Sequence, residues 1–169
     1  NNHNQCDVPS GLKDVIAIEA GGYHSMALKE DGTVVAWGGN NHNQCDVPSG
    51  LKDVIAIAAG GSHSMALKED GTVVAWGYND HNQCDVPSGL KDVVAIEADG
   101  YHSMALKEDG TVVAWGKNSS NQCDVPYGLK GVVAIEGGWV HSMALKEDGT
   151  VVLGGKLGQP VRRAKWIKR

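Results

Sequence analysis

The sequence predicts an all-β propeller made of tandem copies of one unit. Three observations carry that prediction. A stretch of 39 residues, from Asn1 to Gly39, recurs almost letter for letter along the 169-residue chain. Each copy holds short β-branched runs, too short for helices and separated by glycine-containing turns. Four such runs in about 40 residues are the pattern of one propeller blade.

Each unit is expected to hold four strands, named A to D in chain order. Apolar runs without clean alternation indicate strands that are covered on both faces. Between strands B and C, Asp31-Gly32 predicts a hairpin turn, because glycine tolerates positive φ. In the first copy the predicted strands are Val15–Ile18, His24–Leu28, Thr33–Trp37 and Gln44–Val47, the last one ended by Pro48.

The repeats divide the chain into four blades and a tail. Blades start near residues 1, 40, 79 and 118 and together span residues 1–152. The pattern breaks at Leu153, and Gly154 stands where the other copies have tryptophan. In a shifted reading frame, one permitted codon series for the tail spells N-S-D-N-Q-C-D-V-P-S-G-L-K, which is the next repeat. We therefore interpret residues 153–169 as a frameshift-derived basic tail.

That break bears on how the ring closes. Blade four is expected to lack its fourth strand, while the N-terminus supplies a spare one, and unpaired edges are a liability. We expect two chains to join head to tail as an eight-bladed homodimer. A self-closed or an open four-blade array is the alternative. The residues assigned to closure are Gln5, Cys6, Asp7, Val8, Val151 and Val152.

The repeat resembles a known family. The phrase V-x-A-I-x-A-G-x-x-H-S-x-A-L-K-x-D-G-x-V-x-A-W-G-x-N is similar to the regulator-of-chromosome-condensation repeat, above all to the short bacterial form found in propellers that inhibit β-lactamases. The resemblance implies the propeller fold over residues 1–152. Fold does not imply function. The copies carry no insertion like those that hold guanine-nucleotide-exchange or chromatin contacts, so those activities are not carried over.

Differences among the four copies point to one face of the propeller. The B–C turn K-E-D-G is identical in all copies, whereas the A–B and C–D loops differ, and these two loops share a face in an antiparallel meander. Interfaces are enriched in tyrosine and tryptophan. We expect a recognition surface with aromatic anchors and a charged rim, made of Tyr23, Tyr78, Tyr101, Trp139, Glu19, Glu97, Glu136, Asp80, Asp99 and Lys117. Drift in permissive loops is the alternative.

Catalytic and metal chemistry is not indicated. The repeated histidines of the H-S pairs are expected to link blades, and the loop histidines His3, His42 and His81 lack zinc-ligand spacing. The Asp-Gly aspartates are explained by their turns. No nucleophile, base and orienting group occur together at one place. We predict no enzyme, no cofactor and no metal.

Charge and cysteines limit the partners. The net charge is −5, and residues 153–169 contribute +6, so residues 1–152 carry −11. An acidic body argues against non-specific nucleic-acid binding, and no apolar run is long enough to span a membrane. Cys6, Cys45, Cys84 and Cys123 repeat at one position, expected to be buried on a strand, and lie too far apart to pair. Unpaired cysteines favour the cytoplasm, although the compartment stays unknown.

The leading hypothesis is therefore a non-catalytic binding or scaffold module that recognises protein through one loop face. A second hypothesis is a recently amplified, truncated propeller whose properties are folding and assembly alone. A third, implied by the resemblance, is a hydrolase inhibitor of the β-lactamase type.

Overall fold

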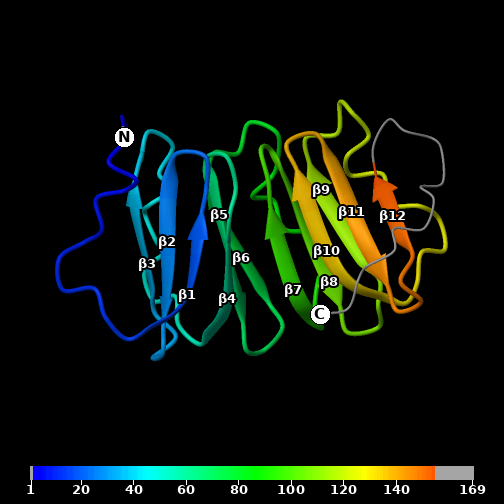
Figure 1. Cartoon of the computed structure of the whole chain (residues 1–169), viewed down its shortest axis with the longest axis horizontal. Coiled ribbons are helices and arrows are strands. Elements are labelled where there is room, and N and C mark those ends of the chain that lie inside the picture. The colour runs from blue at the N-terminus through cyan, green and yellow to red at the C-terminus, as the bar shows by residue number, and fades with distance from the viewer. Residues whose placement is uncertain (1, 155–169) are drawn as a thin grey trace.

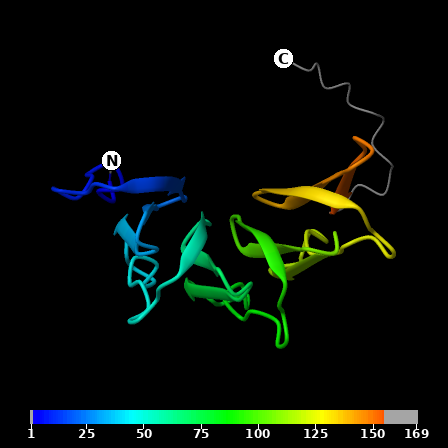
Figure 2. The ribbon, with the colours of Figure 1, turned by 90° about the horizontal axis from the view of Figure 1, so that it is seen from below.

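The computed structural model describes residues 2–154, which form twelve strands in four three-stranded sheets. We call these sheets blades one to four and keep the names A, B and C for the strands of each. Figures 1 and 2 show the blades following one another along an open arc, with β1 to β3 at one end and β10 to β12 at the other. The strands are β1 (Val15–Ala20), β2 (His24–Lys29), β3 (Val34–Gly38), β4 (Val54–Ala59), β5 (His63–Lys68), β6 (Val73–Gly77), β7 (Val93–Ala98), β8 (His102–Lys107), β9 (Val112–Gly116), β10 (Val132–Gly138), β11 (His141–Lys146) and β12 (Val151–Gly154).

Strands A, B and C pair as antiparallel meanders in every blade. Strand A pairs with B through a register shift after its first residue, as between Val15 and Ala17 in blade one. Strands B and C pair without a shift. The sequence prediction of these three strands per unit is confirmed, with ends that differ by one or two residues.

The B–C turns follow the Asp-Gly signal. Gly32 has φ +75°, and the Asp31 carboxylate accepts hydrogen bonds from the Thr33 hydroxyl (2.6 Å) and amide (3.0 Å). These bonds lower the pKa of the Asp31 carboxyl to about 2. The same arrangement recurs at Asp70 and Asp109. The turn aspartates thus act in turn formation, as their sequence predicts.

The predicted fourth strand is not formed. Residues 44–47 belong instead to a linker that precedes each blade, and Asn43, with φ +62°, bends the chain there. The Asp46 amide donates to the carbonyl of Asn43 across a turn. Asn40 fixes this turn from both sides, because its side chain donates to Asp46 Oδ1 (2.7 Å) and accepts from the Cys45 amide (2.8 Å). Asparagine tolerates the left-handed conformation that a strand would forbid.

Each linker covers the outer edge of the blade that follows it. The Gln44 carbonyl accepts hydrogen bonds from Ser64 Oγ (2.8 Å) in β5 and from the indole of Trp76 (3.0 Å) in β6. The Gln83 carbonyl accepts hydrogen bonds from Ser103 Oγ and the Trp115 indole in the same way. A blade is therefore completed by the segment before it.

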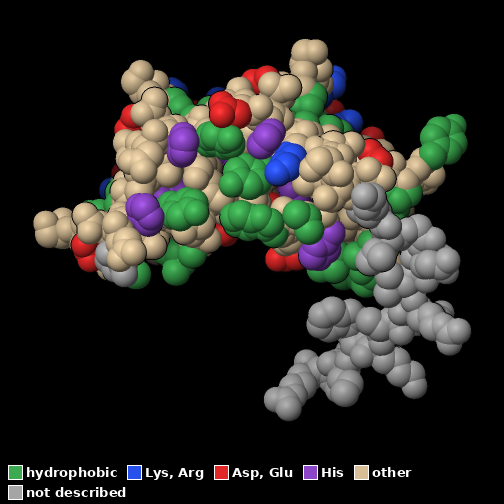
Figure 3. All heavy atoms as spheres, turned by 90° about the horizontal axis from the view of Figure 1, so that it is seen from above, with side chains coloured by type: hydrophobic (Ala, Val, Ile, Leu, Met, Phe, Trp, Pro, Cys, Tyr) green, Lys and Arg blue, Asp and Glu red, His purple; other side chains and the backbone are tan. Residues whose placement is uncertain are grey.

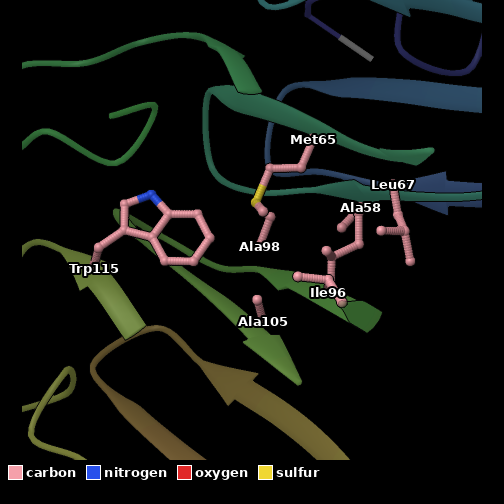
Figure 4. Close-up of a cluster of buried hydrophobic side chains, with 8 residues drawn as sticks. Ala58, Met65, Leu67, Ile96, Ala98, Ala105 and Trp115 are labelled. Atoms are coloured by element: carbon pink, nitrogen blue, oxygen red, sulfur yellow. The ribbon is translucent and has the colours of Figure 1, made fainter. Parts of the chain in front are cut away.

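The hydrophobic core lies between blades. Strand B of one blade packs against strand A of the next, so that Met26 and Leu28 meet Val54, Ile57 and Ala59 in one cluster. Figure 4 shows the corresponding cluster between blades two and three, where Met65 and Leu67 meet Ile96 and Ala98. Neighbouring A strands also contact one another, β1 with β4, β4 with β7, and β7 with β10, which places them at the hub.

The two ends of the arc leave core positions uncovered. Ile18 in β1 is 74% exposed, whereas its counterparts Ile57 and Ile96 are 6% and 8% exposed. On blade four, Ala134, Ile135, Met143 and Leu145 border a depression of about 370 Å³. The single chain is thus an open arc and not a self-closed four-blade ring.

Blade four does not end where the repeat pattern breaks. Leu153 and Gly154 continue β12 and pair with Met143 and Ser142 of β11. The first two residues assigned to the tail therefore complete a third strand. The remainder of the tail, residues 155–169, lies outside the described residues.

Candidate recognition surface

Four aromatic side chains predicted as anchors lie on one face of the arc. Tyr23, Tyr101 and Trp139 come from A–B loops, and Tyr78 comes from the start of a linker. The ring of Tyr101 lies 5.7 Å from that of Tyr78 and 5.7 Å from that of Trp139, edge to face in both contacts. Figure 3, seen from above, shows hydrophobic and histidine side chains gathered across the middle of the molecule.

Three loop histidines join these rings, and we call the whole set the aromatic stripe: Tyr23, Tyr78, Tyr101, Trp139, His3, His42 and His81. His3 contacts Tyr23 at 5.0 Å between ring centroids, and His42 contacts Tyr78 at 4.8 Å. His81 lies 6.0 Å from Tyr78 and 5.4 Å from Tyr101. From the sequence, these histidines were considered only as zinc ligands, for which they lack the spacing. Their contacts with tyrosine were missed because pairs such as His3 with Tyr23 and His42 with Tyr78 are far apart in the sequence.

Glycine packing between blades brings the A–B loops together. The Gly61 amide donates to the carbonyl of Asp99 at 3.0 Å, and the Gly22 amide donates to Gly60 in the same way. A Cβ added to Gly61 would lie 2.6 Å from the carbonyl oxygen of Gly100. A larger residue at Gly61 would push the loops apart, so this glycine sets the spacing of the stripe.

A groove opens along the stripe over blades one and two. Its volume is about 570 Å³, and polar and aromatic groups line it together. The lining residues are His3, Tyr23, Gly39, Asn41, His42, Gln44, Ser62, Tyr78, Asp80 and Tyr101. Four predicted site residues therefore line the groove. Tyr23 and Tyr101 come from A–B loops, and Tyr78 and Asp80 come from a linker.

Charged groups flank the rings. The Lys117 ammonium lies 4.9 Å from the centroid of the Tyr101 ring, within cation–π distance. Desolvation and a hydrogen bond to Asp80 raise the pKa of the Tyr78 hydroxyl. The stripe therefore already holds one ammonium group against an aromatic face.

The three glutamates assigned to the rim lie elsewhere. Glu19, Glu97 and Glu136 are on strands β1, β7 and β10, at the hub. Burial, followed by the charges of Asp99, Glu136 and Glu19, raises the pKa of the Glu97 carboxyl to about 8. Burial and the charge of Glu136 also raise the pKa of Glu19. These carboxylates are close enough to repel one another, but they do not surround the aromatic stripe.

Asp99 is also partly buried between blades and does not belong to the rim. Its Oδ2 atom occupies the space that a Cβ on Gly137 would take, and this atom has no hydrogen-bond partner among the described residues. Burial and then Glu136 raise the pKa of the Asp99 carboxyl to about 6. Oδ2 lies 3.9 Å from Nε2 of His102, whose pKa is lowered to about 4 by burial and then by His141, so the two form no ion pair at neutral pH.

The histidines of the H-S pairs link successive blades. His24 Nε2 lies 2.8 Å from Ser64 Oγ, His63 Nε2 lies 3.0 Å from Ser103 Oγ, and His102 Nε2 lies 2.9 Å from Ser142 Oγ. Each serine hydroxyl donates to a glutamine carbonyl of its linker. The serine oxygen must therefore accept, and the histidine donates from Nε2. Burial lowers the pKa of His24 to about 4, which keeps this donor neutral.

The residues assigned to ring closure are used differently. The Gln5 carbonyl accepts from Ser25 Oγ and the Trp37 indole, both at 3.0 Å, so the segment with Cys6, Asp7 and Val8 covers blade one. Val151 and Val152 pair with Leu145 and Ala144 inside blade four. The N-terminal segment is thus not a spare strand. A ring would have to close through the faces of the end blades.

The repeated cysteines lie in the linkers and not on strands. Cys45, Cys84 and Cys123 are half-buried, and each Sγ lies 3.3 Å from the first carbonyl of its linker. Burial, and then a neighbouring aspartate, raises the pKa of the Cys84 thiol to about 12. The expected place on a buried strand was wrong, because the turn at Asn43 and its counterparts ends any strand there.

Residues 2–154 contain neither a metal-binding cluster nor a membrane-spanning helix. No group of three or more histidine, cysteine or acidic side chains in this part of the chain is arranged to hold a metal ion. Nor does this part contain a helix long and apolar enough to cross a membrane.

Family comparison agrees with the repeat. The model described as "Regulator of chromosome condensation (RCC1) repeat" matches residues 15–44, 54–83 and 93–122, more than half of the chain. The chain belongs to the RCC1-repeat family. The matched segments run from strand A through the first part of the following linker. A search of curated proteins gives no match.

Solved structures show the same fold. Yeast RCC1 (Prp20) bound to Kap60 is similar with a TM-score of 0.76 and 22% identity, over 94% of this chain and 50% of that chain. Prp20p from Saccharomyces cerevisiae, described with its binding properties to Gsp1p and histones, gives 0.76 and 24%, over 88% and 47%. The computationally designed Ika4 protein gives 0.53 and 15%, over 86% and 94%. This chain thus spans about half the length of the yeast proteins.

Proposed function

We propose that this RCC1-type propeller is a non-catalytic module that binds a protein partner through the aromatic stripe. The observation that carries the proposal is the stripe itself, in which side chains from four repeats meet on one face. Aromatic groups that stay half-exposed beside a polar groove are typical of interfaces, because they offer large, rigid contact area. Tyr23 and Trp139 remain 44% and 56% exposed.

The chemistry of the stripe favours a partner with basic side chains. Lys117 shows that the Tyr101 ring accepts an ammonium group, and Tyr78 and Tyr23 offer similar rings beside Asp80. The body of the chain carries −11. The similar yeast protein is described with Kap60, Gsp1p and histones, which are proteins, and this supports a protein as the partner here.

Paired affinity capture tests this function. The bait is the whole chain, compared with Tyr78→Ala, Tyr101→Ala and Tyr127→Ala. Tyr127 is a fully exposed tyrosine that lies outside the stripe and serves as the matched control. We expect a protein that is retained by the wild type and by Tyr127→Ala and is lost with either stripe variant. Equal retention by all four baits would contradict the proposal and leave folding and assembly as the chain's properties.

We also propose a second copy of the chain as its assembly partner. The support is the pair of uncovered faces, Val15 and Ile18 on blade one and Met143 and Leu145 on blade four. At the first two internal junctions, their counterparts are buried against each other. Two four-bladed arcs joined head to tail at these faces would form an eight-bladed ring. The mass of the 17.8 kDa chain in solution distinguishes a dimer from a monomer.

A further inference from the structure

Each end of the arc carries one member of the histidine–serine pair that forms a buried hydrogen bond at the internal junctions. At the three internal junctions, a histidine of one blade donates to a serine forty residues later, in the next blade. His24, His63 and His102 are completely buried by these contacts. His141 holds the same place in blade four, yet it is exposed, since no blade follows blade four within residues 2–154.

The matching acceptor is Ser25, in blade one at the other end of the arc. Ser25 receives no hydrogen bond from a histidine among the described residues, because no blade precedes blade one there. Its hydroxyl already donates to the Gln5 carbonyl at 3.0 Å, as Ser64, Ser103 and Ser142 donate to Gln44, Gln83 and Gln122. The Ser25 oxygen therefore presents its free lone pairs in the orientation that a histidine Nε2 meets elsewhere.

We infer that His141 of one chain donates a hydrogen bond to Ser25 of a second copy, and that two such bonds lock a head-to-tail ring. This inference rests on the proposed self-assembly and adds the polar contact that fixes its register. The apolar faces alone would tolerate sliding, whereas a buried donor without an acceptor is costly. The lock thus favours the one docking geometry that repeats the internal junctions.

Sedimentation equilibrium of single variants gives the first test. Ser25→Ala and His141→Ala are each expected to raise the dimer dissociation constant by about tenfold or more, because a homodimer of either variant breaks the hydrogen bond at both junctions. Ser64→Ala is the matched control inside the chain. It should lower the denaturation midpoint without a comparable change in dimer affinity. Unchanged affinity in both end variants would overturn the lock while leaving the dimer intact.

Mixing the two variants gives a sharper test. A heterodimer of Ser25→Ala with His141→Ala contains one intact lock and one junction in which both partners are removed together. Each homodimer instead contains two half-broken locks. Native mass spectrometry of an equimolar mixture should therefore show heterodimers in clear excess over the statistical half. A statistical mixture would refute the lock, and a chain that stays monomeric at every concentration would refute the self-assembly on which it rests.

Discussion

At the scale of single residues, the four repeats differ where neighbouring blades must fit together. Blades one and two have Gly21 and Gly60 opposite the alanines Ala59 and Ala98 of the next blade. At the third junction both partners change. Asp99 replaces the glycine, and Gly137 replaces the alanine whose Cβ the carboxylate would strike. The two changes compensate each other, and they make this junction different from the other two.

A double-mutant cycle tests this compensation. Gly137→Ala should destabilise the chain by about 1–3 kcal/mol, because the new Cβ overlaps Asp99 Oδ2 in a packed junction. Asp99→Gly should be tolerated, since it also removes a buried carboxylate. The double variant recreates the pair found at blades one and two and should recover at least wild-type stability. Urea denaturation measures all four proteins, and additive effects would contradict direct contact.

Glu97 is expected to make stability depend on pH. Its folded pKa of about 8 exceeds the ordinary 4.5, so the folded state holds this proton more tightly than the unfolded chain. Stability from this group is complete below about pH 4.5 and is lost as the pH rises through 8. Glu97→Gln should therefore match the wild type in melting temperature near pH 5 and exceed it at pH 9. Glu30→Gln, in an exposed turn, is the control and should show no such crossover.

At the scale of elements, the linker is the part that sequence reasoning described incorrectly. Strands A to C followed from β-branched runs and the Asp-Gly turn, which are local signals. The linker looked like a fourth strand because Cys45 and Val47 are apolar, but Asn43 takes a left-handed φ and Gln44 directs its carbonyl to Ser64 and Trp76. Those contacts join residues twenty and thirty-two positions apart, which no local pattern reveals.

The same limit applies to the candidate site. Variation among copies pointed to four aromatic side chains that do lie on one face, because loop position is a property of the repeat. It could not place Glu97 or Asp99, which occupy blade junctions, since the neighbour of a residue in the next blade is set by tertiary packing. The ring contacts of the loop histidines were missed because they too depend on tertiary packing, which brings His42 and Tyr78 together from opposite ends of one repeat.

The tryptophans of the C strands are expected to hold the linkers against the blades through their indole hydrogen bonds. Trp115→Phe removes the 2.9 Å hydrogen bond from the indole to the Gln83 carbonyl, while the Ser103 bond remains. We expect a loss of about 1 kcal/mol in stability and faster amide exchange in residues 83–90. Blade four provides a natural comparison, because Gly154 replaces the tryptophan there. Its linker, residues 117–131, should exchange faster than residues 78–92 in the wild type, and equal rates would count against the indole's role.

At the scale of the whole molecule, the three internal blade junctions indicate how a junction between two chains would be built. Three internal interfaces show which positions face a neighbouring blade and which face solvent regardless of neighbours. The residue at position 18 of the repeat is buried in blades two and three, as Ile57 and Ile96, and partly buried in blade four, as Ile135. Position 16, two residues earlier on the same strand, stays exposed in all four blades, at 59%, 54%, 54% and 51% for Ile16, Ile55, Val94 and Val133. Substitutions at Ile18 and Ile16 in β1 can therefore distinguish an effect on dimer formation from an effect on folding.

Ile18→Glu should abolish the dimer without unfolding the chain. In the isolated arc this side chain is 74% exposed, so a carboxylate costs little there, whereas at a closed junction it would be buried among apolar groups at a cost of several kcal/mol. Ile16→Glu adds the same charge to the same strand and should leave the dimer intact, because this position faces solvent in every blade. Size-exclusion chromatography with light scattering measures both, with circular dichroism to confirm folding. If the two variants dissociate equally, charge alone weakens association and the end faces do not meet as the internal junctions do.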